Sequence, residues 1–440
     1  MSTKPKMEDK GFLEKTFKLT ENNTNVRTEI LAGVTTFMTM AYIIIVNPQI
    51  LSATGMDIGA LFTATCLSAA VATIVMAFHA NYPFALAPGM GLNAFFAFTV
   101  VLGMGYSWEF ALTAVLIEGI IFILLTLFNI REAIINCIPM SIKHGVSVGI
   151  GLFIAFIGLS NAGIIVGYEA TKVTLGDMGN PAVLLALMGL VITGVLLAKK
   201  VRGALLWGIF ATAVIGIPMG VTPMPTGFMS APPSLSPIAF KFDFSQVFTM
   251  DMFVVVFTFL FVDLFDTVGT LVGVSTKAKM LDKDGKLPRA KQALLADAIG
   301  TTFGAMVGTS TVTTYVESAS GALEGGRTGL TALTTGALFL VALLFSPILT
   351  IVPGAATAPA LILVGLFMLS PIKDVNFDDY TEAIPAFMTI IMMPLTYSIA
   401  HGIVFGILAY VFLKVLTGRS KELSLPIYVL AIAFIFKFTL

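Results

Sequence analysis

Long apolar runs recur roughly every 20 to 30 residues along the chain, and they constrain the fold more than any other feature of the sequence. Across 440 residues, 57% are hydrophobic and only 11% are charged. This composition is far too apolar for a water-soluble globule, and runs of about 20 apolar residues are long enough to cross a bilayer as helices. We therefore expect an all-α polytopic membrane protein.

The apolar runs define about fourteen expected crossings. The predicted spans are 29–50, 58–79, 83–103, 108–129, 144–162, 181–198, 203–219, 250–274, 292–307, 309–324, 329–350, 354–370, 380–397 and 399–417. The Pro-rich stretch 220–237 cannot be a regular helix, so it separates seven spans from seven. The segment 425–440 is apolar but short for a full crossing, and we expect it to lie along the membrane.

These boundaries predict the organisation of the chain. It comprises a cytoplasmic tail over 1–28, a first seven-span repeat over 29–219, an external linker over 220–249, a second seven-span repeat over 250–417 and a C-terminal cytoplasmic or interfacial segment over 418–440. An odd number of spans in each half forces the two halves into opposite orientations, so related halves would form an inverted repeat.

Basic residues are distributed unevenly between the two sides of the predicted bundle. The segments expected on the cytoplasmic side carry most of the lysines and arginines, whereas the opposite side carries Lys172 and Lys241. This asymmetry predicts a multi-pass protein of the cell membrane with both termini in the cytoplasm. The formal net charge is zero, with 25 basic and 25 acidic residues, so no global field favours a nucleic-acid partner.

The apolar stretch Asp251–Val274 places two carboxylates, Asp263 and Asp266, where a membrane helix would be deepest. Their spacing of three predicts that both face one side of a helix. A carboxylate in hydrocarbon persists where it meets partners or a water-filled cavity, so such a pair marks a transport site. The alternative is a structural pair bonded to neighbouring hydroxyls such as Thr267 and Thr270.

Two expected spans contain breaks at corresponding positions in the two halves. The first break, PGMGLNAFF from Pro88, contains Gly91 and Asn93, whose amide suits the mixed hydrogen-bonding edge of a heterocycle. The second, GTSTVTTYVESASG from Gly308, contains hydroxyls such as Thr311 and then Glu317. Paired breaks of this kind predict a binding site at the midplane of the membrane. The alternative at the first break is close helix packing at the glycines with an interhelical bond from the amide.

Two further acids, Glu118 and Asp297, lie in expected spans that have no break. A proton relay and an interhelical hydrogen bond are equally compatible with both of them. The sequence contains no nucleotide-binding loop, nucleophile triad or metal-ligand spacing, so we expect neither an enzyme nor a bound metal or cofactor.

Four motifs resemble the AzgA-type purine permeases of the nucleobase-cation symporter and nucleobase-ascorbate transporter superfamily. They are GVTTFMTMAYIIIVNPQIL, APGMGLNAFF, FVDLFDTVGTL and GTSTVTTYVESASG, in this order along nearly the whole chain. The resemblance implies a uracil-permease-type fold of fourteen spans, with spans 1–4 and 8–11 as a core and the others as a gate. It implies a short strand and a half-helix in spans 3 and 10.

The resemblance also implies the site. The substrate-site asparagine of the family falls on Asn93, its span-eight aspartates on Asp263 and Asp266, and its span-ten glutamate on Glu317. The implied activity is proton-coupled uptake of hypoxanthine, guanine and often adenine. The expected partners are these purines, protons and the lipid bilayer, with a homodimer as a candidate assembly.

The residues themselves are consistent with such a transporter. A neutral purine presents N–H donors that a carboxylate accepts, and a titratable acid supplies the coupling. We expect Asp266 and Glu317 to touch the base or carry the proton, and Asp263 to orient that site. The rival within the same fold class is an anion transporter or channel, which would need a buried cation at the breaks.

Overall fold

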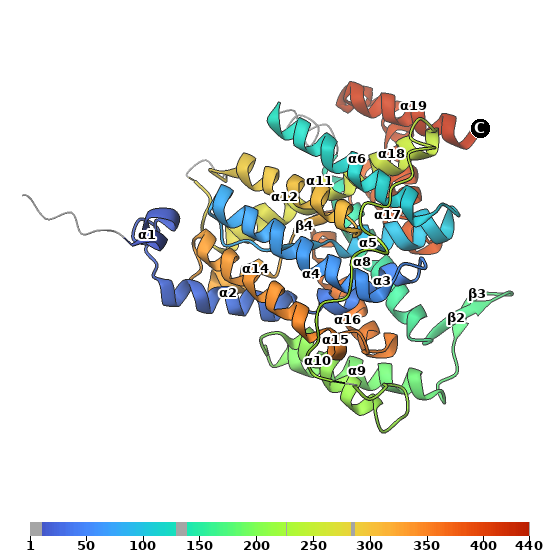
Figure 1. Cartoon of the computed structure of the whole chain (residues 1–440). Coiled ribbons are helices and arrows are strands. Elements are labelled where there is room, and N and C mark those ends of the chain that lie inside the picture. Colours follow the sequence, from blue (N-terminus) through green and yellow to red (C-terminus); the bar gives the residue numbers. More distant parts are fainter. Residues whose placement is uncertain (1–10, 129–138, 226, 283–286, 440) are drawn as a thin grey trace, which may run out of the picture.

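The computed structural model of the chain describes residues 11–128, 139–225, 227–282 and 287–439, and these residues are predominantly helical (Figure 1). In the first half of the chain the elements are α1 (Phe12–Phe17), α2 (Val26–Met40), α3 (Ile43–Ser52), α4 (Ile58–Val75), η1 (Met76–Ala80), β1 (Leu86–Pro88), α5 (Met90–Ala94), η2 (Phe95–Gly103), α6 (Trp108–Leu127), α8 (Met140–Asn161), β2 (Ile165–Tyr168), β3 (Lys172–Leu175), α9 (Pro181–Ala198) and α10 (Ala204–Gly216). In the second half they are α11 (Met250–Lys277), α12 (Ala290–Val307), β4 (Val312–Thr314), α13 (Ser318–Leu323), α14 (Gly329–Ala342), η3 (Leu343–Phe345), α15 (Ser346–Leu349), α16 (Gly354–Phe367), η4 (Ser370–Asp374), α17 (Tyr380–Leu395), α18 (Ile399–Leu416), η5 (Ser420–Glu422) and α19 (Leu425–Thr439).

The helices match the expected apolar segments, with boundaries that differ by up to several residues. Within the described parts of the chain, nine helical stretches are long and apolar enough to cross a membrane. Shorter apolar helices cover Met90–Gly103, Ala204–Gly216 and Tyr380–Leu395. The helix α8 starts at Met140, directly after its N-cap Pro139 and earlier than the predicted start at 144. The structure is therefore that of a helical, multi-pass membrane protein.

The two predicted breaks each contain a short strand followed by a short helix. Strands β1 and β4 pair antiparallel, with Leu86 opposite Thr314 and Pro88 opposite Val312. Both strands are buried, so their outward backbone groups need partners other than water. The β1–β4 pair therefore joins the two halves of the chain at the centre of the molecule.

Threonines on two flanking helices satisfy equivalent backbone groups of the two strands. On α4, the Thr73 hydroxyl donates to the Leu86 carbonyl at 3.1 Å and accepts from the Leu86 amide at 2.9 Å. On α12, the Thr301 hydroxyl donates to the Val312 carbonyl at 2.9 Å and accepts from the Val312 amide at 3.2 Å. Leu86 and Val312 are the first residues of their strands, so the two strands are anchored in the same way.

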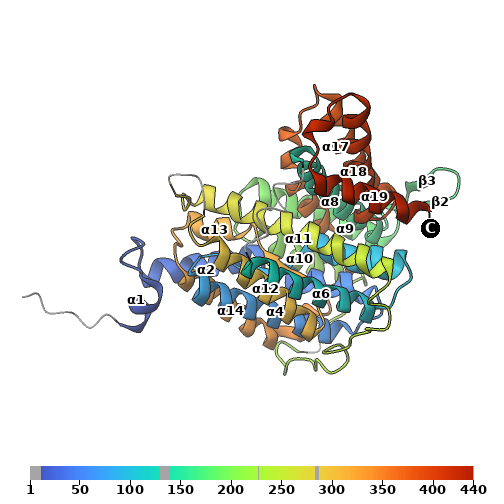
Figure 2. The ribbon, with the colours of Figure 1, turned by 90° about the horizontal axis from the view of Figure 1, so that it is seen from above.

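The helices pack into two groups, and each half of the chain contributes to both. In one group, α4, α11 and α12 contact the β1–β4 pair, α6 and α14 pack on these helices, and α2 packs on α14. In the other, α8, α9, α10, α16, α17 and α18 pack on one another, and Figure 2 shows α8, α17 and α18 projecting from the first group. We call these groups the core and the gate. They meet where α5, η2 and α11 contact α8 and α18, which places the strand crossing close to their interface.

The segments outside the two groups have separate contacts. The described residues between α10 and α11 form turns and extended chain that bond to the core, as in the Phe240 amide that donates to the Met306 carbonyl at 2.9 Å. The segment predicted to lie along the membrane forms α19, whose buried side chains Ile427, Ala431 and Phe434 recur at helical spacing. The ring of Phe434 packs against Phe257 of α11.

Candidate functional site

Gly89 lies at the turn between β1 and α5, where other groups approach its backbone closely. A Cβ atom at this position would lie 2.6 Å from Thr313 Cγ2 and 3.8 Å from Asp266 Oδ2. The first distance is far below van der Waals contact, so a side chain would displace strand β4. The absence of a side chain therefore allows α5, β4 and the carboxylate of Asp266 on α11 to meet at one point.

Asp266 and Glu317, the two acids expected to touch the base or carry the proton, come together at this point. Both carboxylates are half-buried and lie close enough to interact electrostatically. The hydroxyl of Tyr42 on α3's N-terminal side donates to Glu317 Oε1 at 2.8 Å. The hydroxyl of Tyr315 donates to the Pro88 carbonyl at 2.6 Å and lies near both acids. The site therefore offers two carboxylates of limited solvent access, framed by two tyrosines.

Asp263 does not share the environment of Asp266. Its side chain is fully buried in the core, and its Oδ1 atom lies 3.0 Å from Thr267 Oγ1. The same Thr267 oxygen lies 2.9 Å from Asp297 Oδ1 on α12 and 2.8 Å from Thr313 Oγ1 on β4. A spacing of three turns a helical position by about 300°, so the two carboxylates differ by about 60° in direction. That difference directs Asp263 into the core and Asp266 toward the space beside Glu317.

The predicted residues Asn93 and Thr311 lie inside the packed strand crossing. The Asn93 side chain is fully buried, and its Oδ1 atom accepts a hydrogen bond from the Ser310 hydroxyl. Among the described residues, no partner satisfies the Asn93 Nδ2 atom. The hydroxyl of Thr311 donates to Glu118 Oε2 on α6 at 2.7 Å. Glu118 thus makes the interhelical bond that was one of its two sequence-based alternatives.

Gly91 lies at the contact between core and gate. A Cβ atom at this position would be 2.7 Å from Ile150 Cγ2 on α8. Ile150 is 3% exposed, so the contact is a packed one. Gly91 therefore allows the first break to approach the gate closely.

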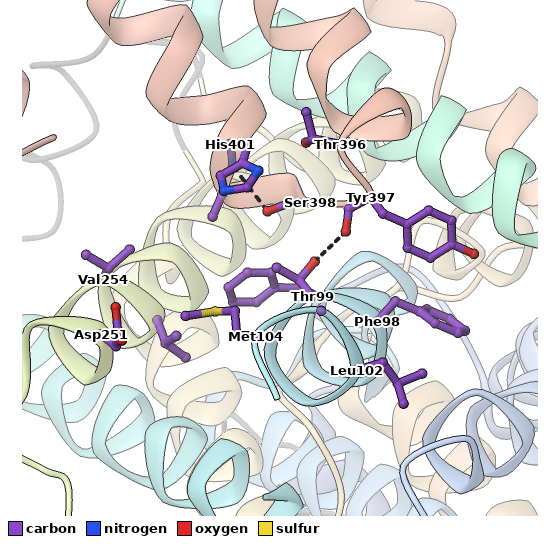
Figure 3. A pocket seen from close by; sticks show the side chains of 14 residues that line it. Phe98, Thr99, Leu102, Met104, Asp251, Val254, Thr396, Tyr397, Ser398 and His401 are labelled. Atoms are coloured by element: carbon purple, nitrogen blue, oxygen red, sulfur yellow. Dashed lines mark hydrogen bonds between the residues drawn. The ribbon is translucent and has the colours of Figure 1, made fainter. Parts of the chain in front are cut away.

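A cavity of about 590 Å³ lies between η2, the first turns of α11 and the junction of α17 with α18 (Figure 3). Its lining includes Phe95, Thr99, Asp251, Tyr397 and His401, and the Thr99 hydroxyl donates to the Tyr397 carbonyl at 3.3 Å. None of the six predicted site residues belongs to this lining. The cavity is therefore a separate space on the core–gate interface, on the side where α11 begins.

One carboxyl group of this cavity lining is hydrogen-bonded to a tyrosine. Asp251 Oδ2 accepts a hydrogen bond from the hydroxyl of Tyr106 at 2.5 Å. This bond, with a smaller contribution from burial, raises the pKa of Tyr106 to about 12. The phenol consequently stays neutral at physiological pH and continues to donate to the carboxylate.

Sequence reasoning missed Tyr42 as a site residue. Tyr42 is only 1% exposed and lies in an apolar span rich in isoleucine, where a tyrosine is more often a packing residue. The only sequence signal for Tyr42 was a hydroxyl group within a long apolar span. No local pattern connects this residue to Glu317, which follows 275 positions later.

Comparison with known proteins identifies the family of this chain. Residues 27–405 match the model of the Permease family. The chain is similar to the adenine permease AdeP of Escherichia coli (strain K12), with 46% identity over 97% of this chain and 96% of that protein. It is similar to the guanine/hypoxanthine permease PbuG of Bacillus subtilis (strain 168), with 47% identity over 96% of this chain and 98% of that protein.

Solved structures show the same fold at low sequence identity. The transmembrane domain of the cyanobacterial bicarbonate transporter BicA superposes with a TM-score of 0.63 at 17% identity, over 87% of this chain and 97% of that domain. The broken segments, the paired strands and the near full-length similarities agree with one another, and the chain belongs to the Permease family of nucleobase transporters.

Proposed function

We propose that this protein imports purine nucleobases together with protons across the cell membrane. The observation that carries the proposal is the pair Asp266 and Glu317, two half-buried carboxylates held together at the crossing of the broken segments. Neutral purines present N–H donors along their edges, and carboxylates accept such bonds. The similarity to adenine and guanine/hypoxanthine permeases supports hypoxanthine, guanine and adenine as the substrates to test.

Coupling to protons follows from the same pair. Two carboxylates close together in a site of limited water access repel one another when both are ionised, so protonation of one relieves the repulsion. A purine that binds to the singly protonated pair would carry the proton with it through the transport cycle. Asp266 and Glu317 are therefore proposed both as purine ligands and as the acids that couple uptake to the proton gradient, with Asp263 as a residue that orients them.

The remaining predicted site residues act through the shape of the first break. Asn93 is proposed to present its Nδ2 group to the purine once the site opens, because that group has no partner among the described residues. Gly91 provides close contact with the gate, and Thr311 fixes the second break to α6 through Glu118.

The proposed topology is fourteen crossings in two inverted repeats of seven, 29–219 and 250–417. The equivalent hydrogen bonds of Thr73 with Leu86 and of Thr301 with Val312 support this relation, because they anchor corresponding strands to corresponding helices. With 220–249 outside, both the tail over 1–28 and the segment 418–440 would lie on the cytoplasmic side.

An anion transporter is the second candidate, because the transmembrane domain of the bicarbonate transporter BicA shares the fold. A site for an anion requires a nearby cation or a set of N–H donors to offset the ligand charge. The predicted site presents the carboxylates of Asp266 and Glu317 instead, and these would repel an anion. The charge of the site therefore favours a neutral base.

Uptake into proteoliposomes that contain no ATP tests the proposal. An inward proton gradient should drive accumulation of radiolabelled hypoxanthine, guanine or adenine, and a protonophore should abolish the accumulation. Accumulation that requires sodium and ignores the pH gradient would refute the proton assignment. Uptake of bicarbonate but of none of the three purines would support the anion transporter.

A further inference from the structure

Thr267 lies at the centre of a buried cluster whose hydrogen atoms can be counted. Its Oγ1 atom is within hydrogen-bond distance of Asp263 Oδ1 at 3.0 Å, Asp297 Oδ1 at 2.9 Å and Thr313 Oγ1 at 2.8 Å. The four side chains are at most 1% exposed. A threonine hydroxyl has one hydrogen and two lone pairs, so it can donate one hydrogen bond and accept two.

The three contacts therefore require hydrogens from more than one source. Thr267 supplies one hydrogen, and Thr313 can supply a second through its own hydroxyl. The third must come from a carboxyl group, because an ionised carboxylate only accepts. If Thr267 donates to Thr313 instead, both carboxyl groups must supply hydrogens.

We propose that Asp263 and Asp297 share one proton through the hydroxyl of Thr267, so that the cluster carries a single negative charge. One carboxyl group donates to Thr267 Oγ1, and Thr267 donates to the other carboxylate. The proton can occupy either carboxyl group, with the Thr267 hydrogen reoriented accordingly. No covalent bond other than O–H changes, and no co-reactant is needed.

The cluster is connected to the proposed purine site through two short paths. Asp263 precedes Asp266 by less than one helical turn and interacts with it electrostatically. Thr313 contributes its hydroxyl to the cluster, and its methyl group faces Gly89, where a Cβ atom would lie 2.6 Å from it. Asp297 and Thr267 are thus positioning residues that act on Asp266 through Asp263 and β4. This positioning role rests on the proposed function, whereas the shared proton does not.

Infrared spectroscopy of the purified full-length protein in lipid, without purine, tests the shared proton. The carbonyl stretch of a protonated carboxyl group is separate from the carboxylate bands. Asp263→Asn and Asp297→Asn should each remove one acid band, because the new amide donates to Thr267 and the remaining carboxylate needs no proton. Thr267→Ser should retain the band. An acid band of wild-type intensity in both Asp→Asn variants would overturn the proposal.

A control on the same helix separates the cluster from general packing. Thr258 is buried in α11 and donates to the Val254 carbonyl at 2.7 Å. Thr258→Val should keep the acid band and wild-type uptake, whereas Thr267→Val should shift the band and lower purine uptake about tenfold. The two Asp→Asn variants should lower uptake less than Asp266→Asn does, since an amide replaces the protonated carboxyl group.

The outcomes distinguish the two proposals. Loss of the acid band in either Asp→Asn variant supports the shared proton even if no purine is transported by any variant. Equal loss of purine uptake in Thr267→Ser and Thr267→Val, with the band retained in the serine variant, would overturn the positioning role. If one Asp→Asn variant fails to fold, the other makes the same prediction independently.

Discussion

A single methyl group added at Gly91 should change the equilibrium between core and gate. In Gly91→Ala the new Cβ atom would lie 2.7 Å from Ile150 Cγ2, whereas ordinary contact begins at 3.4 Å. The difference requires the first break and α8 to separate by about 0.7 Å. Ile150 is branched at Cβ and buried, so rotation of its side chain cannot easily provide that space.

The magnitude follows from the cost of overpacking. Extra methyl groups in a packed interior typically cost about 1–3 kcal/mol. If transport requires the packed core–gate contact in one of its states, that state becomes about 5–150 times less populated. We expect the maximal rate of purine uptake to fall by a factor in this range, while the protein still folds and inserts. Substitution by valine should abolish transport.

The assay compares initial uptake rates in proteoliposomes for Gly91→Ala, Ile150→Ala and the double variant. The double variant should transport faster than Gly91→Ala, because the removed Cγ2 atom leaves room for the new Cβ atom. Gly269→Ala is the matched control, since Gly269 is helical and a Cβ atom there would meet nothing within 4 Å. Wild-type rates in Gly91→Ala, or equal losses in Gly91→Ala and Gly269→Ala, would refute the steric explanation.

Three further predictions concern the proposed purine site and an ion pair that follows α18. Asp266→Asn and Glu317→Gln should each eliminate accumulation of purine against a gradient, and at least one of them should also lose equilibrium binding of purine, measured by calorimetry. Wild-type accumulation in either variant would contradict the assignment. Tyr42→Phe should raise the KM for purine uptake roughly tenfold, because Glu317 loses a hydrogen-bond donor worth about 1.5 kcal/mol. An unchanged KM would show that Tyr42 is not part of the site. The Arg419 guanidinium donates to Asp379 at 2.6 Å and holds the pKa of that carboxyl group well below its ordinary value of 3.8. A carboxyl group whose pKa is lowered in the folded state stabilises the fold above pH 3.8 and loses this effect at lower pH. Arg419→Met should therefore lower the melting temperature at neutral pH and have little effect on it in strong acid.

Much of the architecture could be predicted because hydrocarbon imposes strong requirements on sequence. Apolar runs long enough to cross a bilayer identify helices with little ambiguity. Pro88 with its neighbouring glycines correctly located the β1 break, because proline removes a backbone donor and the glycines permit close approach. The small and β-branched residues that interrupt the run from Gly308 correctly located the β4 break. The meeting of Asp266 with Glu317 was also predictable, because each acid lies beside a feature that a membrane helix would otherwise exclude.

The exact directions of the acids could not be predicted from spacing. Asp263 and Asp266 are both polar positions on one helix, and local sequence does not say which neighbour each will meet. The answer depends on Asp297 and Thr313, which come from two other elements brought to α11 only by the fold. Similarly, Asn93 is fully buried because Ser310 of the second break lies against it. Long-range pairing therefore determines which polar groups are structural and which are accessible.

The strand crossing explains how such pairing can serve transport. The β1–β4 pair holds two short helices at the centre of the molecule, where an uninterrupted helix would present no free backbone groups. On one side of the crossing, Thr267 is hydrogen-bonded to Asp263 and Asp297 within the core. On the other side, Asp266 and Glu317 remain half-buried. A buried, hydrogen-bonded cluster behind a partly accessible one would allow the proposed purine-site acids to change protonation and ligand while the core that carries them keeps its shape.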